Sequence, residues 1–201
     1  MPTSFARLSA LAVLLALLAM GCGPGRTTVE RGPLTARSLY PMQDGYTWTY
    51  DIDTETEMNN LGVTRVTRVS GNRVEITTDA SETHVYELRE EGVYRADGEV
   101  WLLRDPIVVG TEWPSLSGHT ARITSVTETV DVFAGHYEGC VEVMEEGGDS
   151  NRTIRTIYCQ GVGPVLVEVA QSPVTSMAGV VTVTGRLRDF NDGTDDAWLE
   201  E

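Results

Sequence analysis

The side chains with which this chain could do acid–base chemistry are three histidines and a surplus of carboxylates. His84, His119 and His136 lie on separate segments of the sequence. A histidine that acts as a general base in a hydrolase needs a nucleophile and an orienting group beside it. The sequence has neither a serine or cysteine elbow nor an H-x-x-H or H-E-x-x-H spacing. We therefore expect no enzyme activity, no catalytic residue, no metal ligand and no cofactor. A hydrolase that uses His84 or His136 with a nearby carboxylate is the less favoured alternative.

Two groups of carboxylates need a separate interpretation. Asp51 and Asp53 share one face of a predicted strand, at a spacing that would in principle allow acid–base work, but an exposed strand edge is the favoured explanation. Residues 189–201 are acidic without a basic partner, which predicts a solvated and disordered tail. The stretch DFNDGTDD within it is out of step with an EF-hand calcium loop, so calcium binding is only an alternative for this tail.

The cysteines predict one structural disulfide. If Cys22 is acylated, Cys140 and Cys159 are left to pair in an oxidising compartment. A hairpin centred on residues 146–151 places Cys140 opposite Cys159, Val141 opposite Tyr158, and Val143 opposite Thr156. The alternation of apolar residues and the disulfide thus require the same register. Closing this loop would stabilise the fold by roughly 3 kcal/mol.

The amino terminus predicts a location. Residues 10–20 form an apolar run that is too short to span a bilayer, with Arg7 before it, and residues 17–22 read LLAMGC. This pattern resembles the processing signal of bacterial lipoproteins, although Ala19 occupies the position where leucine fits best. The resemblance implies a signal peptide over residues 1–21, acylation of Cys22 and, with Gly23 next, sorting to the outer membrane, facing the periplasm or the cell surface. A plain secretory peptide is the alternative. Residues 22–37 are expected to be a flexible tether.

The charge balance excludes some partners. The formal net charge is −15, and every basic residue is arginine. A chain this acidic is repelled by phosphate backbones, so we expect no nucleic-acid binding. The absence of lysine from the sequence excludes Schiff-base chemistry on a lysine.

The elements that must position these side chains are strands. Short β-branched and aromatic runs alternate with turn signals about every ten residues over residues 38–188. This pattern predicts an all-β domain of about twelve short antiparallel strands, arranged as a partly open barrel or a sandwich. Tyr46, Trp48 and Tyr50 lie at a period of two and should project from one face of a strand into the core, or form a ligand-stacking surface.

Four blocks of this sequence resemble a loosely defined group of uncharacterised bacterial envelope lipoproteins. The blocks are residues 40–50 (YPMQDGYTWTY), 110–113 (GTEW), 130–141 (VDVFAGHYEGCV) and 158–165 (YCQGVGPV). This chain departs from the group at His136 and Tyr137, where a small polar residue and phenylalanine are more usual. The resemblance implies an antiparallel, partly open β-barrel, and it implies no catalytic residue.

These observations favour a lipid-anchored, non-enzymatic envelope protein that either binds an apolar small molecule or docks another envelope protein. If it has a ligand pocket, Trp48, Trp101 and Trp113 are the rings expected to line it. A purely structural envelope component is the alternative.

Overall fold

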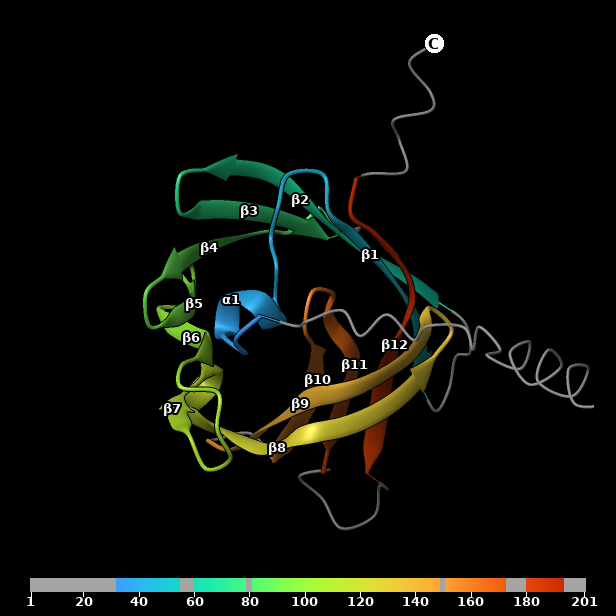
Figure 1. Cartoon of the computed structure of the whole chain (residues 1–201). Helices are drawn as coiled ribbons and strands as arrows, with labels where there is room; N and C mark the ends of the chain where they lie inside the picture. The colour runs from blue at the N-terminus through green and yellow to red at the C-terminus, as the bar shows by residue number, and fades with distance from the viewer. Residues whose placement is uncertain (1–31, 55–59, 79–80, 149–150, 173–179, 194–201) are drawn as a thin grey trace, which may run out of the picture. The chain divides into compact units, whose positions relative to one another are not determined.

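The structure is a computed structural model that describes residues 32–54, 60–78, 81–148, 151–172 and 180–193. Residues 1–21, Cys22 and most of the expected tether lie outside these residues. The chain from Pro33 onward forms one unit. Its elements are α1 (Ala36–Leu39), β1 (Thr47–Thr54), β2 (Asn60–Ser70), β3 (Arg73–Thr78), β4 (Thr83–Arg89), β5 (Gly92–Arg95), β6 (Val100–Arg104), β7 (Glu112–Pro114), a 3₁₀ turn (Leu116–Gly118), β8 (His119–Val132), β9 (Gly135–Gly147), β10 (Arg152–Cys159), β11 (Gly163–Gln171) and β12 (Val181–Asn191) (Figure 1).

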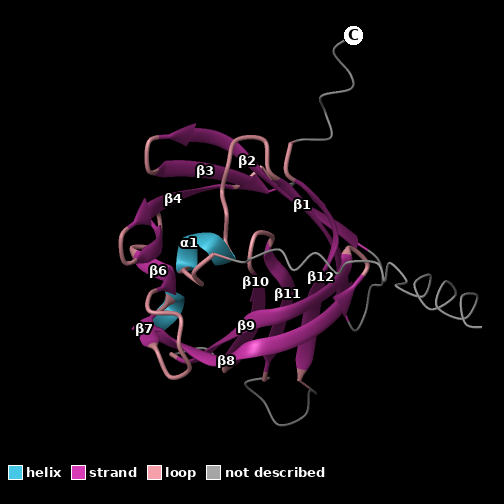
Figure 2. Ribbon diagram, viewed as in Figure 1, coloured by secondary structure: helices cyan, strands magenta, loops and turns pink. Residues whose placement is uncertain are grey.

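The twelve strands form one antiparallel sheet in the order β6-β5-β4-β3-β2-β1-β12-β11-β10-β9-β8-β7. The sheet curls into a nearly closed barrel around α1, as the ribbon in Figure 2 shows. The edge strands β6 and β7 face each other across a seam, and no backbone pairing joins them among the described residues. A side chain crosses the seam instead, because the indole Nε1 of Trp113 donates to the carbonyl of Trp101 at 3.0 Å. The predicted all-β class and the number of strands are confirmed.

The core is formed by the inward side chains that alternate along each strand. On β3, Val74 and Ile76 are 0% and 1% exposed, and they lie opposite Tyr86 and His84 on β4. Residues opposite each other in an antiparallel pair point to the same side of the sheet, so His84 also faces inward. This placement matters for the site described below.

The disulfide and its register are as predicted. Cys140 and Cys159 are bonded, and both are buried. β9 and β10 pair Val141 with Tyr158 and Val143 with Thr156.

The packed domain begins and ends outside the predicted limits. Ala36 falls within the expected tether, yet it is fully buried as the first residue of α1. Thr35 caps α1, and the Ala36 amide donates to Asp105 Oδ1 at 3.0 Å. At the other end, β12 continues to Asn191, because Trp48 pairs with Phe190 and stacks on its ring. The acidic tail was therefore predicted to start too early, and residues 194–201 lie outside the described part.

Candidate functional site

The two ends of the barrel differ in how they are filled. At one end, the Gly161 amide in the β10–β11 turn donates to the carbonyl of Ser38, and Arg37 donates to the carbonyls of Leu88 and Arg89 at the end of β4. The segment that contains α1 therefore occupies this end. The opposite end, where β1, β3 and β11 finish and β12 begins, contains a cavity of about 290 Å³. Its volume is at the lower limit of small-molecule pockets.

Four strands supply most of the cavity wall, and Thr78 at the end of β3 completes it. The lining residues are Tyr50, Ile52, Gly62, Val63, Thr64, Thr78, Val167, Val169, Val183 and Gly185. Ile52 lies opposite Gly185, and Gly185 lies opposite Val167. A Cβ on Gly185 would meet only the Val167 carbonyl, at 3.9 Å. The missing side chain at this inward position leaves part of the space that forms the cavity.

Tyrosines lie between the cavity and the end that α1 occupies. Tyr50 donates its hydroxyl to the carbonyl of Pro164 at 2.8 Å, and burial raises its pKa. Burial also raises the pKa of Tyr40, Tyr86 and Tyr158, with smaller contributions from the neighbouring tyrosines to Tyr40 and Tyr158. Tyr40 contacts Tyr86 and Tyr158 with ring centroids 6.4 Å and 6.2 Å apart. The tyrosines are therefore neutral at physiological pH, and Tyr50 is the one of the four that lines the cavity.

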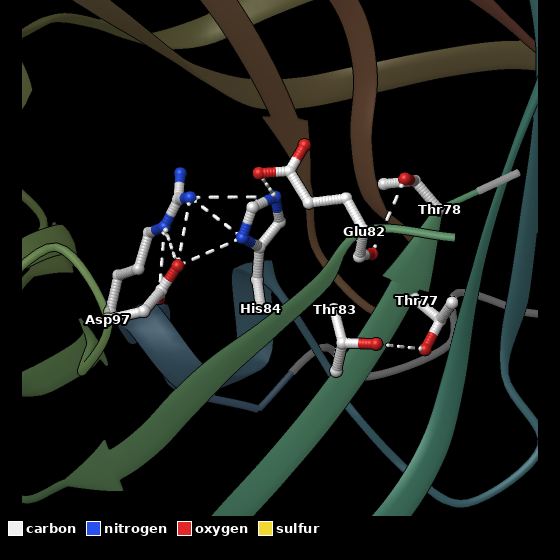
Figure 3. Close-up of polar contacts among 7 residues, drawn as sticks. Thr77, Thr78, Glu82, Thr83, His84 and Asp97 are labelled. Atoms are coloured by element: carbon white, nitrogen blue, oxygen red, sulfur yellow. Dashed lines mark hydrogen bonds and ion pairs between the residues drawn. The ribbon is translucent and has the colours of Figure 1, made fainter. Parts of the chain in front are cut away.

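A charged network begins directly beside the cavity, at Thr78. The amide and hydroxyl of Thr78 both donate to the carbonyl of Glu82, at 2.9 Å and 3.4 Å. The His84 side chain, which is only 14% exposed, places Nδ1 2.9 Å from Asp97 Oδ2 and Nε2 3.5 Å from Glu82 Oε1 (Figure 3). Arg95 contacts the same Asp97 oxygen at 3.0 Å and His84 Nδ1 at 2.8 Å.

The electrostatics of this network centre on Asp97. Burial by itself would raise the pKa of Asp97, but hydrogen bonds from Arg95 and His84 outweigh burial and lower the pKa to about 2. Arg95 and Asp97 both approach Nδ1 of His84. This nitrogen either donates to the carboxylate or accepts from the guanidinium, and it cannot do both at once.

Glu145 faces the barrel interior from the strands opposite this network. It lies opposite the buried Ala121, and its carboxylate accepts a short hydrogen bond from the Ser115 hydroxyl. The negative charge of Glu145 is the largest contribution after burial to the raised pKa of Tyr158. Glu145 is therefore near the interior tyrosines as well as near this end of the barrel.

The histidines do not form a recognisable hydrolytic centre. The hydrogen-bond and ion-pair partners of His84 in the described part of the chain are Glu82, Arg95 and Asp97, none of which is a nucleophile. His136 is half exposed in the β8–β9 hairpin, where it contacts Asp131 at 2.6 Å and Glu138 at 3.3 Å. Hydrogen bonds to Asp131 and Glu138 raise its pKa. His119 is buried.

The other residues singled out in the sequence lie away from the cavity. Trp48 is buried and donates to the Val162 carbonyl at 2.6 Å, near α1. Trp113 seals the seam, and Trp101 packs against Tyr94 at 5.2 Å. None of the three tryptophans is among the residues that line the cavity. Asp51 and Asp53 form ion pairs with Arg188 and Arg186.

The lining residues missed by the sequence analysis are aliphatic side chains, two threonines and two glycines. Gly62 and Gly185 are the signal that was available, because a glycine inside a strand commonly marks a bulge, a bend or a close approach. Neither glycine indicates by itself which face of its strand is hollow.

The described residues contain neither a membrane-spanning helix nor a cluster of metal-binding side chains. No helix there is long and apolar enough to cross a bilayer. No group of three or more histidine, cysteine, aspartate or glutamate side chains in that part is arranged to hold a metal ion.

The chain matches no protein-family model, and no curated protein matches it. Two solved structures are similar to it. One is a "putative exported protein with YmcC-like fold" from Bacteroides fragilis NCTC 9343, at 14% identity and a TM-score of 0.49, covering 76% of this chain and 98% of that one. The other is a "putative lipoprotein" from Parabacteroides distasonis ATCC 8503, at 11% identity and a TM-score of 0.45, covering 80% of this chain and all of that one.

Proposed function

We propose that this protein is a lipid-anchored protein of the bacterial cell envelope that binds a small molecule with an apolar part in the cavity at the end of the barrel opposite α1. The observation that carries the proposal is the cavity itself, about 290 Å³ in volume, with aliphatic side chains at half of its lining positions and no charged residue. Its wall is part of the sheet, so the cavity exists without any rearrangement. No enzyme activity is proposed.

Burial of an apolar ligand supplies the binding energy in this proposal. Each Å² of apolar surface removed from water contributes roughly 25 cal/mol. Ile52, Val167 and Val183 offer such a surface, while the Tyr50 hydroxyl is already bonded to the backbone. Binding therefore does not require the protein to expose or rearrange a buried polar group.

The envelope location rests on the sequence. The apolar run that ends in LLAMGC supports acylation of Cys22, and outer-membrane sorting is the finer part of this proposal. Several acyl chains on one residue, at about 0.8 kcal/mol per buried CH₂, would hold the protein firmly on a membrane. Radiolabelled palmitate should label the expressed protein but not a Cys22→Ser variant. Equal labelling of both would contradict the anchor.

Ligand binding is tested with N-phenyl-1-naphthylamine, a neutral apolar dye that fluoresces in apolar surroundings. The protein is the chain from residue 23 onward, exported behind a cleavable leader so that the disulfide forms and no acyl group is attached. We expect saturable fluorescence at one site. Gly185→Leu should weaken binding at least tenfold, because the new side chain projects into the cavity where a Cβ has room.

Thr182→Leu is the matched control. It adds a leucine to the same strand, β12, but at a position whose side chain points to the other face of the sheet, away from the cavity. It should leave dye binding unchanged. Binding that is equal in both variants, or absent from the parent chain, would contradict a ligand site in this cavity and favour a docking or structural role.

A further inference from the structure

We infer that the ligand of the cavity is an amphiphile with a neutral or cationic polar end, and that the site discriminates against anionic amphiphiles. The inference rests on the proposed function, because it assigns the chemical class of the ligand in the same cavity. It is carried by the distribution of charged side chains around this end of the barrel.

The cavity wall itself carries no charge. Every lining residue is aliphatic, a glycine, a threonine or Tyr50. Burial keeps the Tyr50 hydroxyl neutral by raising its pKa. An ion placed against this wall would lose hydration without gaining a partner, so the part of the ligand that occupies the cavity is apolar.

The charged groups lie next to this wall on both sides. In one direction across the sheet, Val183 pairs with Val169, Val169 with Ile154, and Ile154 with Glu145. Neighbouring strands are about 4.8 Å apart, so Glu145 lies about 10 Å from the lining residue Val169. In the other direction, Thr78 of the lining bonds directly to the backbone of Glu82. A ligand that fills the cavity therefore places its polar end among these groups.

Carboxylates dominate at this end of the barrel. Glu82, Asp97 and Glu145, which we call the mouth carboxylates, outnumber the guanidiniums of Arg95 and of Arg152, which begins β10 at this end. The formal charge of these three carboxylates and two guanidiniums is −1. Nε and Nη2 of Arg95 are directed at Asp97 and His84, so the charge of Arg95 is largely compensated by the Asp97 carboxylate.

The mouth carboxylates instead have acceptor capacity to spare. The Glu82 side chain is 68% exposed and has one contact at 3.5 Å, while Glu145 accepts from the Ser115 hydroxyl through one oxygen. An ionised carboxylate offers about four acceptor sites. Hydroxyl groups or an ammonium on the ligand satisfy these acceptors, whereas a carboxylate or phosphate would be repelled by them.

Displacement of N-phenyl-1-naphthylamine from the same chain tests the inference. Three competitors share one ten-carbon chain: 1-decanoylglycerol is neutral and rich in hydroxyls, decylamine is cationic, and decanoate is anionic. Each is used below its critical micelle concentration at pH 7. We expect decanoylglycerol and decylamine to displace half of the dye at concentrations at least tenfold lower than decanoate. Equal or stronger displacement by decanoate would overturn the inference while leaving the proposed function intact.

Two double variants show whether the discrimination is local. Glu82→Gln with Glu145→Gln removes two mouth carboxylates and should reduce the preference over decanoate at least fivefold. Glu90→Gln with Glu91→Gln removes two exposed carboxylates from the β4–β5 turn, at the end of the barrel that α1 occupies, and should leave the preference unchanged. Equal effects of the two double variants would assign the selectivity to the net charge of the whole chain and overturn the inference. If the dye does not bind the parent chain, the proposed function itself fails.

Discussion

At the scale of single residues, Asp97 is the group that holds the charged network together. It accepts from Arg95 through both oxygens and lies 2.9 Å from His84. Because its pKa falls from an ordinary 3.8 to about 2 in the folded protein, its ionised form stabilises the fold. That contribution is fully present above the unfolded pKa, near pH 4, and is lost as the pH falls through about 2.

We therefore predict that Asp97→Asn lowers the free energy of unfolding by about 1 kcal/mol at pH 7. This value is smaller than that of a fully buried charged hydrogen bond, because a third of the Asp97 side chain is exposed to solvent. The difference from the parent chain should shrink as the pH is lowered from about 4 to 2. Urea unfolding at several pH values measures it. Glu82→Gln, which loses only a long and exposed contact, should cost much less. A difference that does not change with pH would contradict the assigned role of the Asp97 charge.

Some residue-scale features could be predicted from the sequence and others could not. The pairing of Cys140 with Cys159 was predictable because two cysteines and the apolar alternation required one register. The contact between His84 and Asp97 was not, since it depends on how β4, β5 and the turn after them fold inward. Tryptophans were chosen for the pocket because they are large and apolar. The same properties make Trp48 and Trp113 suited to filling the core, and the cavity lies where side chains are small.

At the scale of elements, α1 connects separate parts of the barrel. The Ala36 amide bonds to Asp105, which follows β6, and the Ser38 carbonyl bonds to Gly161, which follows β10. The strands were predictable from their alternation and turn signals. A four-residue helix was not, because it is too short to show a helical period. Its Thr35 and Ser38 capping interactions become recognisable only once the chain is seen to turn into the barrel.

We predict that a chain starting at Ser38 is less stable than one starting at Pro33 by at least about 2 kcal/mol. The shorter chain loses the Thr35 cap, worth about 1 kcal/mol, and the bond from Ala36 to Asp105, worth about another 1 kcal/mol. It also loses the buried Ala36 side chain and the bonds of Arg37 to the carbonyls of β4. Urea unfolding of the two chains measures the difference. A chain starting at Gly32 should match the one starting at Pro33. Equal stability of all three would restore the tether boundary predicted from the sequence.

The disulfide between Cys140 and Cys159 joins the two strands of the β9–β10 hairpin. Replacing both Cys140 and Cys159 by alanine should lower the free energy of unfolding by about 3 kcal/mol, because the disulfide closes a loop with a sequence separation of 19 residues. The parent protein in its reduced form should unfold at nearly the same urea concentration as the double variant. The two differ only in having cysteine thiols or alanines at positions 140 and 159. The double variant should be indifferent to reductant. A parent chain that is also indifferent to reductant would contradict the bond.

At the scale of the whole molecule, the barrel is a single sheet whose two edge strands meet without pairing. Sequence reasoning predicted a partly open barrel or a sandwich, but it could not identify the edges, because strand order depends on contacts between distant segments. β6 and β7 are both short, with five and three residues, and the seven residues 105–111 connect them. The Trp113 side chain, 2% exposed, bridges this seam through its bond to the Trp101 carbonyl. The two edges of the sheet are therefore joined by a side-chain hydrogen bond from one indole and not by backbone pairing between the described residues of β6 and β7.

Loss of the Nε1 donor of Trp113 should loosen the seam between β6 and β7. Trp113→Phe keeps an aromatic ring in the seam but removes the Nε1 donor, so it should cost about 1 kcal/mol for the lost hydrogen bond together with some loss of packing. Amide hydrogen exchange should accelerate in β6 and β7 and remain unchanged in β1 and β12, on the far side of the sheet. Trp101→Phe is the control, because Trp101 contributes only its backbone carbonyl to the bridge, and it should leave exchange in β7 unchanged. Uniform acceleration in all strands of the Trp113→Phe protein would mean that the barrel opens as one cooperative unit, and that the seam is not its weak point.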